Sequence, residues 1–168
     1  MNLVDPRLSE FILVSEIREG QVLAEPIFRY KYGDPAPVDG HHIMALYRDA
    51  GGWLPAAYVN YLSHGPAMLS RGACTDGRVL RAMAPEQLAT VTAAGGLMLQ
   101  LMRYGEALFE DESVATFACC GDARSWSVVE QCGYQRLDHP YLIVRWNRQL
   151  QGAEQRALLD SIHQREPF

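Results

Sequence analysis

The chain has 168 residues, of which 48% are apolar and 21% are charged, and its formal net charge is −5. This length predicts a single domain over residues 1–168, and the composition is that of an ordinary folded protein that buries most of its apolar surface. The negative charge, without any basic cluster, disfavours nucleic acid as a partner, because phosphate binding needs many Lys and Arg contacts.

The sequence contains no apolar run that approaches the ~20 residues needed to span a membrane. Its N-terminal segment carries acids early and lacks the basic flank and apolar core of a signal peptide. We therefore expect a cytoplasmic protein without a membrane partner. The cysteines are then expected to be buried, reduced thiols, and they are Cys74, Cys119, Cys120 and Cys132.

Turn residues divide the first half of the chain. Residues 8–30 are expected to hold a strand and a helix, and the prolines and glycine of residues 34–40 indicate a loop. Three strand-like segments follow, at residues 42–48, 56–62 and 67–75, and turn signals separate them. This spacing predicts an antiparallel meander.

The second half predicts alternating helices and strands. After Gly95-Gly96, four apolar residues recur at helical spacing and indicate one face of an amphipathic helix, namely Leu97, Leu101, Tyr104 and Leu108. Residues 114–120 are expected to form a buried strand, residues 142–146 a last strand, and residues 149–164 a C-terminal helix with a short tail to 168. The order of elements predicts an α/β fold, mixed α+β in layout, with a mixed central sheet flanked by helices.

The segment GDARSWSVVEQCGY, which begins at Gly121, has the signals of a short capped helix that leads into a strand. Asp122 can accept hydrogen bonds as the N-cap, and Gly133 can take the left-handed conformation that ends a helix. The segment resembles the late Asn-x-x-Ala/Ser … Glu-Lys-x-Gly-Phe segment of the Gcn5-related N-acetyltransferase (GNAT) superfamily. The residues that carry the resemblance are Asp122, Ser125, Glu130, Gly133 and Tyr134.

The order of elements from residue 42 to residue 146 is also similar to that of the GNAT superfamily, and the chain resembles a divergent member of it. The resemblance implies a single GNAT-like domain that transfers an acyl group to an amine within a ternary complex. The cosubstrate would be acetyl-CoA or another acyl-CoA, and no metal would be needed. The acceptor would be a small-molecule or peptide amine, whose identity the sequence does not specify.

In the GNAT superfamily the acyl-CoA pyrophosphate lies at a glycine-rich loop that opens the central helix. Glycines let the backbone approach the phosphates, and the helix N-terminus presents free N–H groups. The matching stretch here is residues 90–96, which lacks the leading Gln or Arg of the family. The resemblance assigns Gly95, Gly96 and Leu97 to the pyrophosphate, and the alternative is a plain loop that leads into a core helix.

The family draws the pantetheine arm into a gap between two splayed parallel strands. By resemblance these are the strand through residues 72–75, which contains Cys74, and the strand at 114–120. The peptide groups of an opened strand can bind the pantetheine amides, so side chains carry little signal there. Arg124 and Ser125 are assigned by position to the CoA tail.

The catalytic residues are not specified by the resemblance. Many members of the family place a tyrosine general acid in the late helix, where this chain has Val129. An amine nucleophile must lose a proton, so a general base is useful, and the candidates are Asp76, His64, Glu130 and His139. Tyr134 is a further catalytic candidate, although packing is the more common role of this aromatic position.

Adjacent His41-His42 would diverge on a strand and have no third ligand at a recognisable spacing, so we expect no metal site. Two alternatives to a CoA-dependent enzyme stay open. One is a GNAT-like protein that binds a ligand without catalysis, which the lost family residues favour. The other is an acyltransferase whose donor is an acyl carrier protein. Oligomeric state is also open, with a homodimer among the alternatives.

Overall fold

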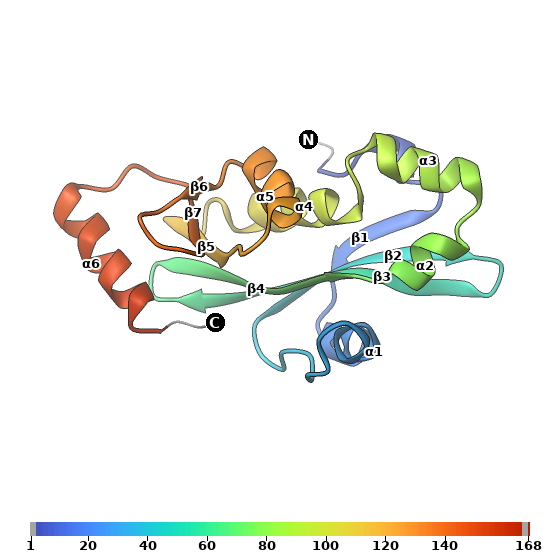
Figure 1. The fold of residues 1–168 in the computed structure, drawn as a ribbon, viewed down its shortest axis with the longest axis horizontal. Coiled ribbons are helices and arrows are strands. Elements are labelled where there is room, and N and C mark those ends of the chain that lie inside the picture. The colour runs from blue at the N-terminus through green and yellow to red at the C-terminus, as the bar shows by residue number, and fades with distance from the viewer. Residues whose placement is uncertain (1–2, 166–167) are drawn as a thin grey trace.

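We describe a computed structural model of the chain over residues 3–165 and residue 168. In this part of the chain seven strands form one mixed sheet in the order β1-β2-β3-β4-β5-β7-β6 (Figure 1). Every neighbouring pair is antiparallel except β4 and β5, which run parallel. The strands are β1 (Ile12–Glu16), β2 (His41–Asp49), β3 (Gly52–His64), β4 (Ala67–Thr75), β5 (Ala115–Cys119), β6 (Gln135–Arg136) and β7 (Leu142–Trp146).

Helices cover both faces of the sheet, with α3, α4 and α5 on one face and α1 on the other (Figure 1). Tyr58 packs in the cluster under α1, and Leu62 packs against the cluster that includes residues of α6. These two residues lie on the same face of β3, because side chains alternate between the two faces along a strand. The α-helices are α1 (Gly20–Tyr32), α2 (Gly77–Ala82), α3 (Pro85–Ala93), α4 (Leu97–Phe109), α5 (Ala123–Val129) and α6 (Gly152–His163), and the 3-10 turns are η1 (Pro6–Leu8) and η2 (Glu130–Cys132).

The predicted meander is confirmed. β2, β3 and β4 pair antiparallel in sequence order, and residues 34–40 form neither helix nor strand. The strand and helix expected within residues 8–30 are β1 and α1, although α1 continues to Tyr32. The fold class predicted from the order of elements is therefore correct.

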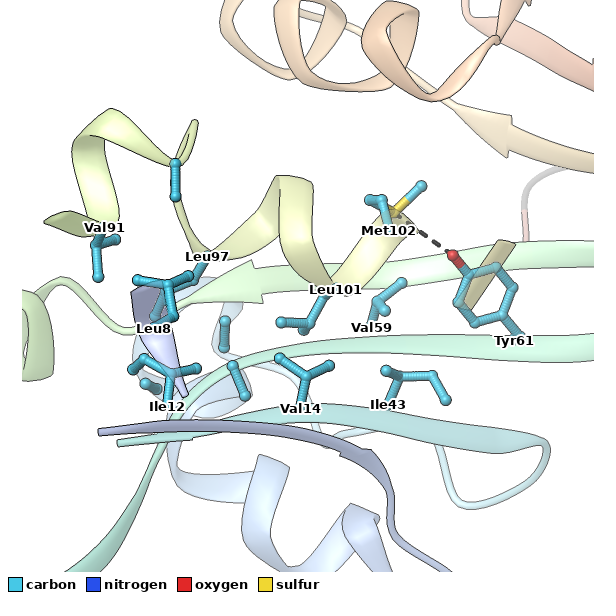
Figure 2. Close-up of a cluster of buried hydrophobic side chains, with 14 of the residues drawn as sticks. Leu8, Ile12, Val14, Ile43, Val59, Tyr61, Val91, Leu97, Leu101 and Met102 are labelled. Atoms are coloured by element: carbon cyan, nitrogen blue, oxygen red, sulfur yellow. Dashed lines mark hydrogen bonds between the residues drawn. The ribbon is translucent and has the colours of Figure 1, made fainter. Parts of the chain in front are cut away.

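The core between α4 and the sheet joins residues that are distant in sequence. Leu97 and Leu101 of α4 lie over Val59 and Ile43 of the meander (Figure 2). At the C-terminal half of the helix, Gly105 lies so close to the ring of Tyr61 that an added Cβ would be 2.4 Å from a ring carbon. The absence of a side chain at position 105 therefore sets how closely α4 approaches β3.

The apolar face predicted for α4 does face the core. Leu97 and Leu101 are buried, and Tyr104 and Leu108 are half-buried and pack against the same cluster. The most buried face also continues through Gly105 and Phe109, and it includes Glu106. A count of apolar residues does not reveal this part of the buried face, because it contains a glutamate and a glycine.

The segment after β5 folds as predicted. The side chain of Asp122 accepts a hydrogen bond from the Ser125 N–H at 2.9 Å and caps α5. The chain leaves η2 through Gly133, which has φ +85°. The expected strand, capped helix and left-handed glycine are therefore confirmed.

Helices α2 and α3, between β4 and α4, were not predicted. Residues 90–93 form the last turn of α3 rather than an open glycine-rich loop. The N–H of Gly95 donates to the Thr92 carbonyl at 3.0 Å, and the N–H of Gly96 donates to the Val91 carbonyl at 2.9 Å. This is the hydrogen-bond pattern of a Schellman cap, so the two glycines end α3 immediately before α4 begins.

Candidate functional site

β4 and β5 separate in the middle of the sheet. Their parallel register runs from Ala67 opposite Ala115 to Ser70 opposite Ala118, and β4 then continues to Thr75 without a partner on β5. On the other strand, the Cys120 N–H donates to the Tyr141 carbonyl at 2.8 Å, on the side of β7. We call the region between residues 71–75 and residues 119–122 the β4–β5 gap.

A β-bulge interrupts β4 beside the gap. Tyr58 pairs with Cys74 and Asn60 pairs with Arg71, so two residues of β4, Gly72 and Ala73, face the single Val59 of β3. Gly72 has φ +63°, and an added Cβ would be 2.9 Å from the Phe28 ring of α1. Both the backbone conformation and the close contact require glycine, and the bulge leaves an extra peptide unit outside the regular ladder.

The C-terminal residue of α1 reaches this bulge. The Tyr32 hydroxyl donates a hydrogen bond of 2.6 Å to the Ala73 carbonyl, and the Tyr32 ring packs 4.9 Å from that of Phe28. Burial raises the pKa of Tyr32, and the charges of Cys74 and Asp122 raise it further. Sequence reasoning missed Tyr32, because its partner is a backbone carbonyl on a strand 41 residues away.

The start of α5 lies at the opposite side of the gap. The carboxylate of Asp122 accepts from both the N–H and the hydroxyl of Ser125, at 2.9 and 2.7 Å, and the hydrogen bond from the backbone is the main cause of its lowered pKa. Arg124 and Ser125 are exposed. The structure therefore places both residues assigned to the CoA tail at the exit of β5, on the first turn of a capped helix.

The residues assigned to the pyrophosphate lie at the start of α4. The N–H groups of Gly95 and Gly96 are used by the cap of α3. The first N–H groups of α4 without a partner inside a helix are therefore those of Leu97 and Met98. Gly96 is the N-cap and has no side chain to accept from that turn. Nothing lies within 4 Å of where its Cβ would be, so the space beside it is open.

Cys74 borders the gap with its backbone only. Its side chain is 1% exposed and packs under α1 beside Tyr58. Burial raises the pKa of its thiol to about 12, and burial likewise raises that of Cys132 to about 12. Because the thiolate is the reactive form, neither thiol has the character of a nucleophile.

The structure does not bring together Asp76, His64 and Tyr134, three of the five catalytic candidates. Asp76 caps α2 and binds the Arg78 guanidinium at 2.8 Å, and the hydrogen bond from the Arg78 side chain is the main reason that its pKa is lowered. His64 lies at the other end of the β3–β4 hairpin, where its Nε2 is 2.9 Å from the Ser161 hydroxyl of α6. Tyr134 is buried and donates to Glu106.

Glu106 is the centre of a buried polar cluster that sequence reasoning also missed. Its Oε1 accepts from the hydroxyls of Tyr134 and Tyr61, the latter at 3.1 Å, while Arg145 of β7 lies 3.7 Å from Oε2. Burial raises the pKa of Glu106 against the opposing effect of these hydrogen bonds and the Arg145 charge. The cluster ties α4 to β3, β7 and the segment after Gly133, on the core side of the sheet.

Two surface hollows lie outside the gap. One, of about 390 Å³, includes Arg7, Arg48 and Glu86, and the other, of about 380 Å³, includes Glu16 and His42. Neither hollow is lined by a residue of β4 or β5. The candidate site is therefore located from the pairing of these two strands. Over residues 3–165 and 168, no helix is long and apolar enough to cross a membrane, and no three His, Cys, Asp or Glu side chains gather as metal ligands would.

No protein-family model matches the sequence, and no curated protein matches it either. Solved structures do match in fold. The ribosomal-protein-S18-alanine N-acetyltransferase from Escherichia coli is 10% identical, with a TM-score of 0.57 over 84% of this chain and 97% of that one. The aminoglycoside 6'-N-acetyltransferase from Enterococcus faecium is 7% identical, with a TM-score of 0.56 over 83% of this chain and 99% of that one.

A third similar structure is an aminoglycoside 6'-N-acetyltransferase complexed with coenzyme A. It is 7% identical, with a TM-score of 0.53 over 83% of this chain and 99% of that one. At such low sequence identities the structural similarity establishes the architecture alone, and the chemistry has to be argued from the residues. The chain therefore has the fold of the Gcn5-related N-acetyltransferases.

Proposed function

We propose that the protein is an N-acyltransferase that transfers the acetyl group of acetyl-CoA to an amine. The observation that carries the proposal is the bulge at Gly72 and Ala73, placed where β4 leaves β5 in an acetyltransferase fold. Peptide groups of residues 71–75 that face the gap suit the amides of pantetheine, which would bind as an added strand binds. Residues 1–168 would act as one acyltransferase domain, in the cytoplasm.

In the proposed reaction the protein orients the two reactants and polarises the thioester. Backbone N–H groups of the bulge would donate to the thioester carbonyl oxygen, where negative charge develops in the transition state. The amine nitrogen attacks the carbonyl carbon, the C–N bond forms, and the C–S bond breaks. Holding both reactants in one complex supplies much of the rate, since it replaces a bimolecular encounter.

The phosphates of CoA would lie at the start of α4. The N–H groups of Leu97 and Met98 and the positive end of the helix dipole suit an anion there, with open space beside Gly96. Gly95 would contribute only the turn, because its N–H is already used. Arg124 and Ser125 of α5 are the side chains proposed for the CoA tail, and Cys74 would contribute its backbone.

The acceptor would be a small-molecule or peptide amine. The similar structures include enzymes named for an alanine of a ribosomal protein and for aminoglycosides, so both classes stay in the proposal. The base that deprotonates the amine is not Asp76, His64 or Tyr134 in this proposal. Asp76 is held by Arg78, His64 lies beside α6, and Tyr134 is buried in the Glu106 cluster.

A second candidate uses a donor that presents pantetheine without adenosine phosphates, as an acyl carrier protein does. The cap that occupies the N–H groups of Gly95 and Gly96 favours it, because it removes two of the expected phosphate donors. The two candidates differ in one measurable respect. The first requires the adenosine phosphates for affinity, and the second does not.

The test compares thermal unfolding with acetyl-CoA and with acetyl-phosphopantetheine, followed by an assay of thiol release with a panel of amines. A ligand at 100 times its Kd stabilises the native state by about 2.7 kcal/mol, which raises the Tm of a chain of this size by roughly 5–10 °C. A shift with acetyl-CoA alone supports the first candidate. Equal shifts support the second, a shift without any turnover supports a protein that binds the donor without catalysis, and no shift contradicts both candidates.

A further inference from the structure

A polar row crosses the sheet on the face that carries α1. His42 of β2 is paired with Asn60 of β3, and Asn60 is paired with Arg71 of β4. Residues directly opposite each other on neighbouring strands point to the same face, so these three side chains share one face of the sheet. His42 and Asn60 are buried, and the Arg71 side chain is 18% exposed.

The row separates two apolar clusters on this face. On β3 it lies between Tyr58, which packs under α1, and Leu62, which packs against the cluster that includes residues of α6. On β4 it lies between Cys74 of the first cluster and Leu69 of the second. The row is therefore a polar strip between the parts of the sheet that α1 and α6 cover.

Arg71 stands at the closed end of the β4–β5 gap. The last pair of the two strands is Ser70 with Ala118, so Arg71 is the first residue of β4 beyond it. Its side chain lies on the face opposite α4, whose first turn is proposed to hold the CoA phosphates (Figure 1). A donor that enters the gap from the side of α4 would carry its acetyl group toward Arg71. The acceptor would approach from the opposite face.

The guanidinium of Arg71 is held in a fixed position. Its Nε donates to Oδ1 of Asn60 at 2.6 Å, and its Nη2 donates to the Asp39 carbonyl at 3.1 Å and to the Asp39 carboxylate. The Asn60 amide in turn donates to the carbonyls of Asp39 and His41, at 2.9 and 3.2 Å. Among residues 3–165 and 168, Nη1 has no hydrogen-bond partner. Its two N–H groups therefore remain available to a ligand.

The loop of residues 34–40 has anchors other than this ion pair. The N–H of buried Ala36 donates to the carboxylate of Glu25 at 2.8 Å. An added Cβ at Gly40 would be 2.4 Å from the carbonyl oxygen of Tyr61, so the loop backbone lies directly on β3. The ion pair is thus not needed to hold the loop, and the acidic side chain in it is 61% exposed.

We propose that the acceptor is a free amino acid, whose carboxylate is bound by Arg71 and whose ammonium group is bound by Asp39. The inference rests on the proposed function and names the acceptor class within it. An Arg–Asp pair presents a positive and a negative group side by side, which matches the two adjacent charges of an amino acid. Nη1 would donate to the carboxylate of the acceptor, and the Asp39 carboxylate has lone pairs left for the ammonium group.

The pair binds and orients the acceptor beside the thioester. The ammonium group loses one proton before its nitrogen attacks the thioester carbon, and it loses a second as the amide forms and the C–S bond breaks. One of these protons ends on the CoA sulfur and the other in solvent. An amine without a neighbouring carboxylate would leave Nη1 without a partner, which is the basis of the expected specificity.

The experiment measures thiol release from acetyl-CoA with three pools of acceptors: free amino acids, the corresponding amino acid amides, and peptides mixed with polyamines. The amides keep the amine and the side chain and lose only the carboxylate charge. Hydrogen bonds to charged groups are worth roughly 10–100-fold in affinity, so kcat/KM for the amino acids should exceed that for the amides at least about 10-fold. Equal or faster turnover of either other pool overturns the inference and leaves the proposed function standing.

Two variants separate acceptor binding from a structural role. Arg71→Gln should lower kcat/KM for the amino acids at least about 10-fold and leave that for the amides nearly unchanged. Asp39→Asn should lower kcat/KM for both pools, because both carry the ammonium group. The matched control is Arg7→Gln, which breaks another Arg–Asp pair, with Asp5 on the α4 side, and should change neither value.

Equal losses for amino acids and amides in Arg71→Gln would mean that Arg71 acts only on the structure, and would overturn the inference. The Kd for acetyl-CoA, measured by calorimetry, should be the same in all variants as in the wild type. If Arg71→Gln does not fold, the wild-type comparison of amino acids with amides and the Asp39→Asn variant decide. If the wild type releases no thiol with any pool, the proposed function fails together with the inference.

Discussion

The hydroxyl of Tyr134 donates a hydrogen bond to the carboxylate of Glu106 inside the core. The relationship links the Gly-Tyr exit of η2 to the middle of α4, the helix whose first turn is proposed to hold the CoA phosphates. Oε2 of the same carboxylate has no hydrogen-bond partner among the residues that the structure describes. A buried, incompletely paired carboxylate of this kind costs stability when it is charged.

Glu106→Gln tests that cost. The pKa of Glu106 is raised in the folded state, mainly by burial. The contribution of protonated Glu106 to the free energy of unfolding is therefore complete at pH values below the pKa of this residue in the unfolded chain. It is lost as the pH rises through the folded pKa. The wild type should therefore lose more stability than Glu106→Gln between pH 5 and pH 8, as measured by urea unfolding. Equal losses in the two proteins would show that Glu106 titrates normally.

Gly105→Ala should weaken the contact between α4 and β3. The new Cβ would lie 2.4 Å from a ring carbon of Tyr61, and overpacking of a core costs typically about 1–3 kcal/mol. Gly152→Ala is the control, because its Cβ would meet only the end of the Arg156 side chain, at 3.6 Å. Denaturant unfolding should show a loss for Gly105→Ala and no loss for Gly152→Ala. An unchanged stability of Gly105→Ala would mean that Tyr61 can move away at no cost.

Asp122→Ala should destabilise α5 by removing its N-cap. The pKa of Asp122 is lowered, chiefly by the backbone hydrogen bond from Ser125, so its contribution is present above the unfolded pKa and is lost as the pH falls through the folded pKa. The stability difference between wild type and variant should therefore shrink in acid. A difference that is independent of pH would refute this role. Asp122→Asn, which keeps an acceptor at the cap, should retain most of the stability at neutral pH.

Met98→Pro tests the phosphate site by removing one of its proposed N–H donors. Gly96 has φ +88° and ψ 162°, a conformation that L residues rarely adopt, so replacing that glycine would confuse strain with ligand binding. Met98 is the second residue of α4, where the N–H makes no bond within the helix and proline is tolerated. Met98→Pro should weaken CoA binding several-fold, and Met98→Ala, which keeps the N–H, should not. Equal affinities would move the phosphates away from this turn.

The sequence predicted most of the sheet because its signals are local. The meander follows from turns beside strand-like runs, and the Asp122 cap and Gly133 lie within one short segment. Helices α2 and α3 were missed because residues 76–94 carry few periodic apolar positions, and α3 ends in the same glycines that a phosphate loop would contain. The sequence therefore did not indicate that the N–H groups of Gly95 and Gly96 are used by the cap of α3.

The candidate site was harder to predict than the fold because long-range contacts define it. The sequence around Tyr32 does not indicate that its hydroxyl reaches Ala73. The sequence around Gly72 does not indicate a bulge opposite Val59. Glu106 is similar, because its partners Tyr61, Tyr134 and Arg145 lie on separate elements. Sequence patterns place residues on elements, whereas the tertiary fold decides which side chains meet.

The most direct test of acyl-CoA binding in the β4–β5 gap is hydrogen exchange of the backbone amides with and without saturating acetyl-CoA. Acetyl-CoA bound in the gap should slow exchange in two separate segments, the bulge at residues 72–75 and the first turn of α4 at residues 97–100. Amides of the β2–β3 hairpin, away from the gap, should be unaffected. Unchanged exchange in both segments, or protection confined to another part of the surface, would contradict the account.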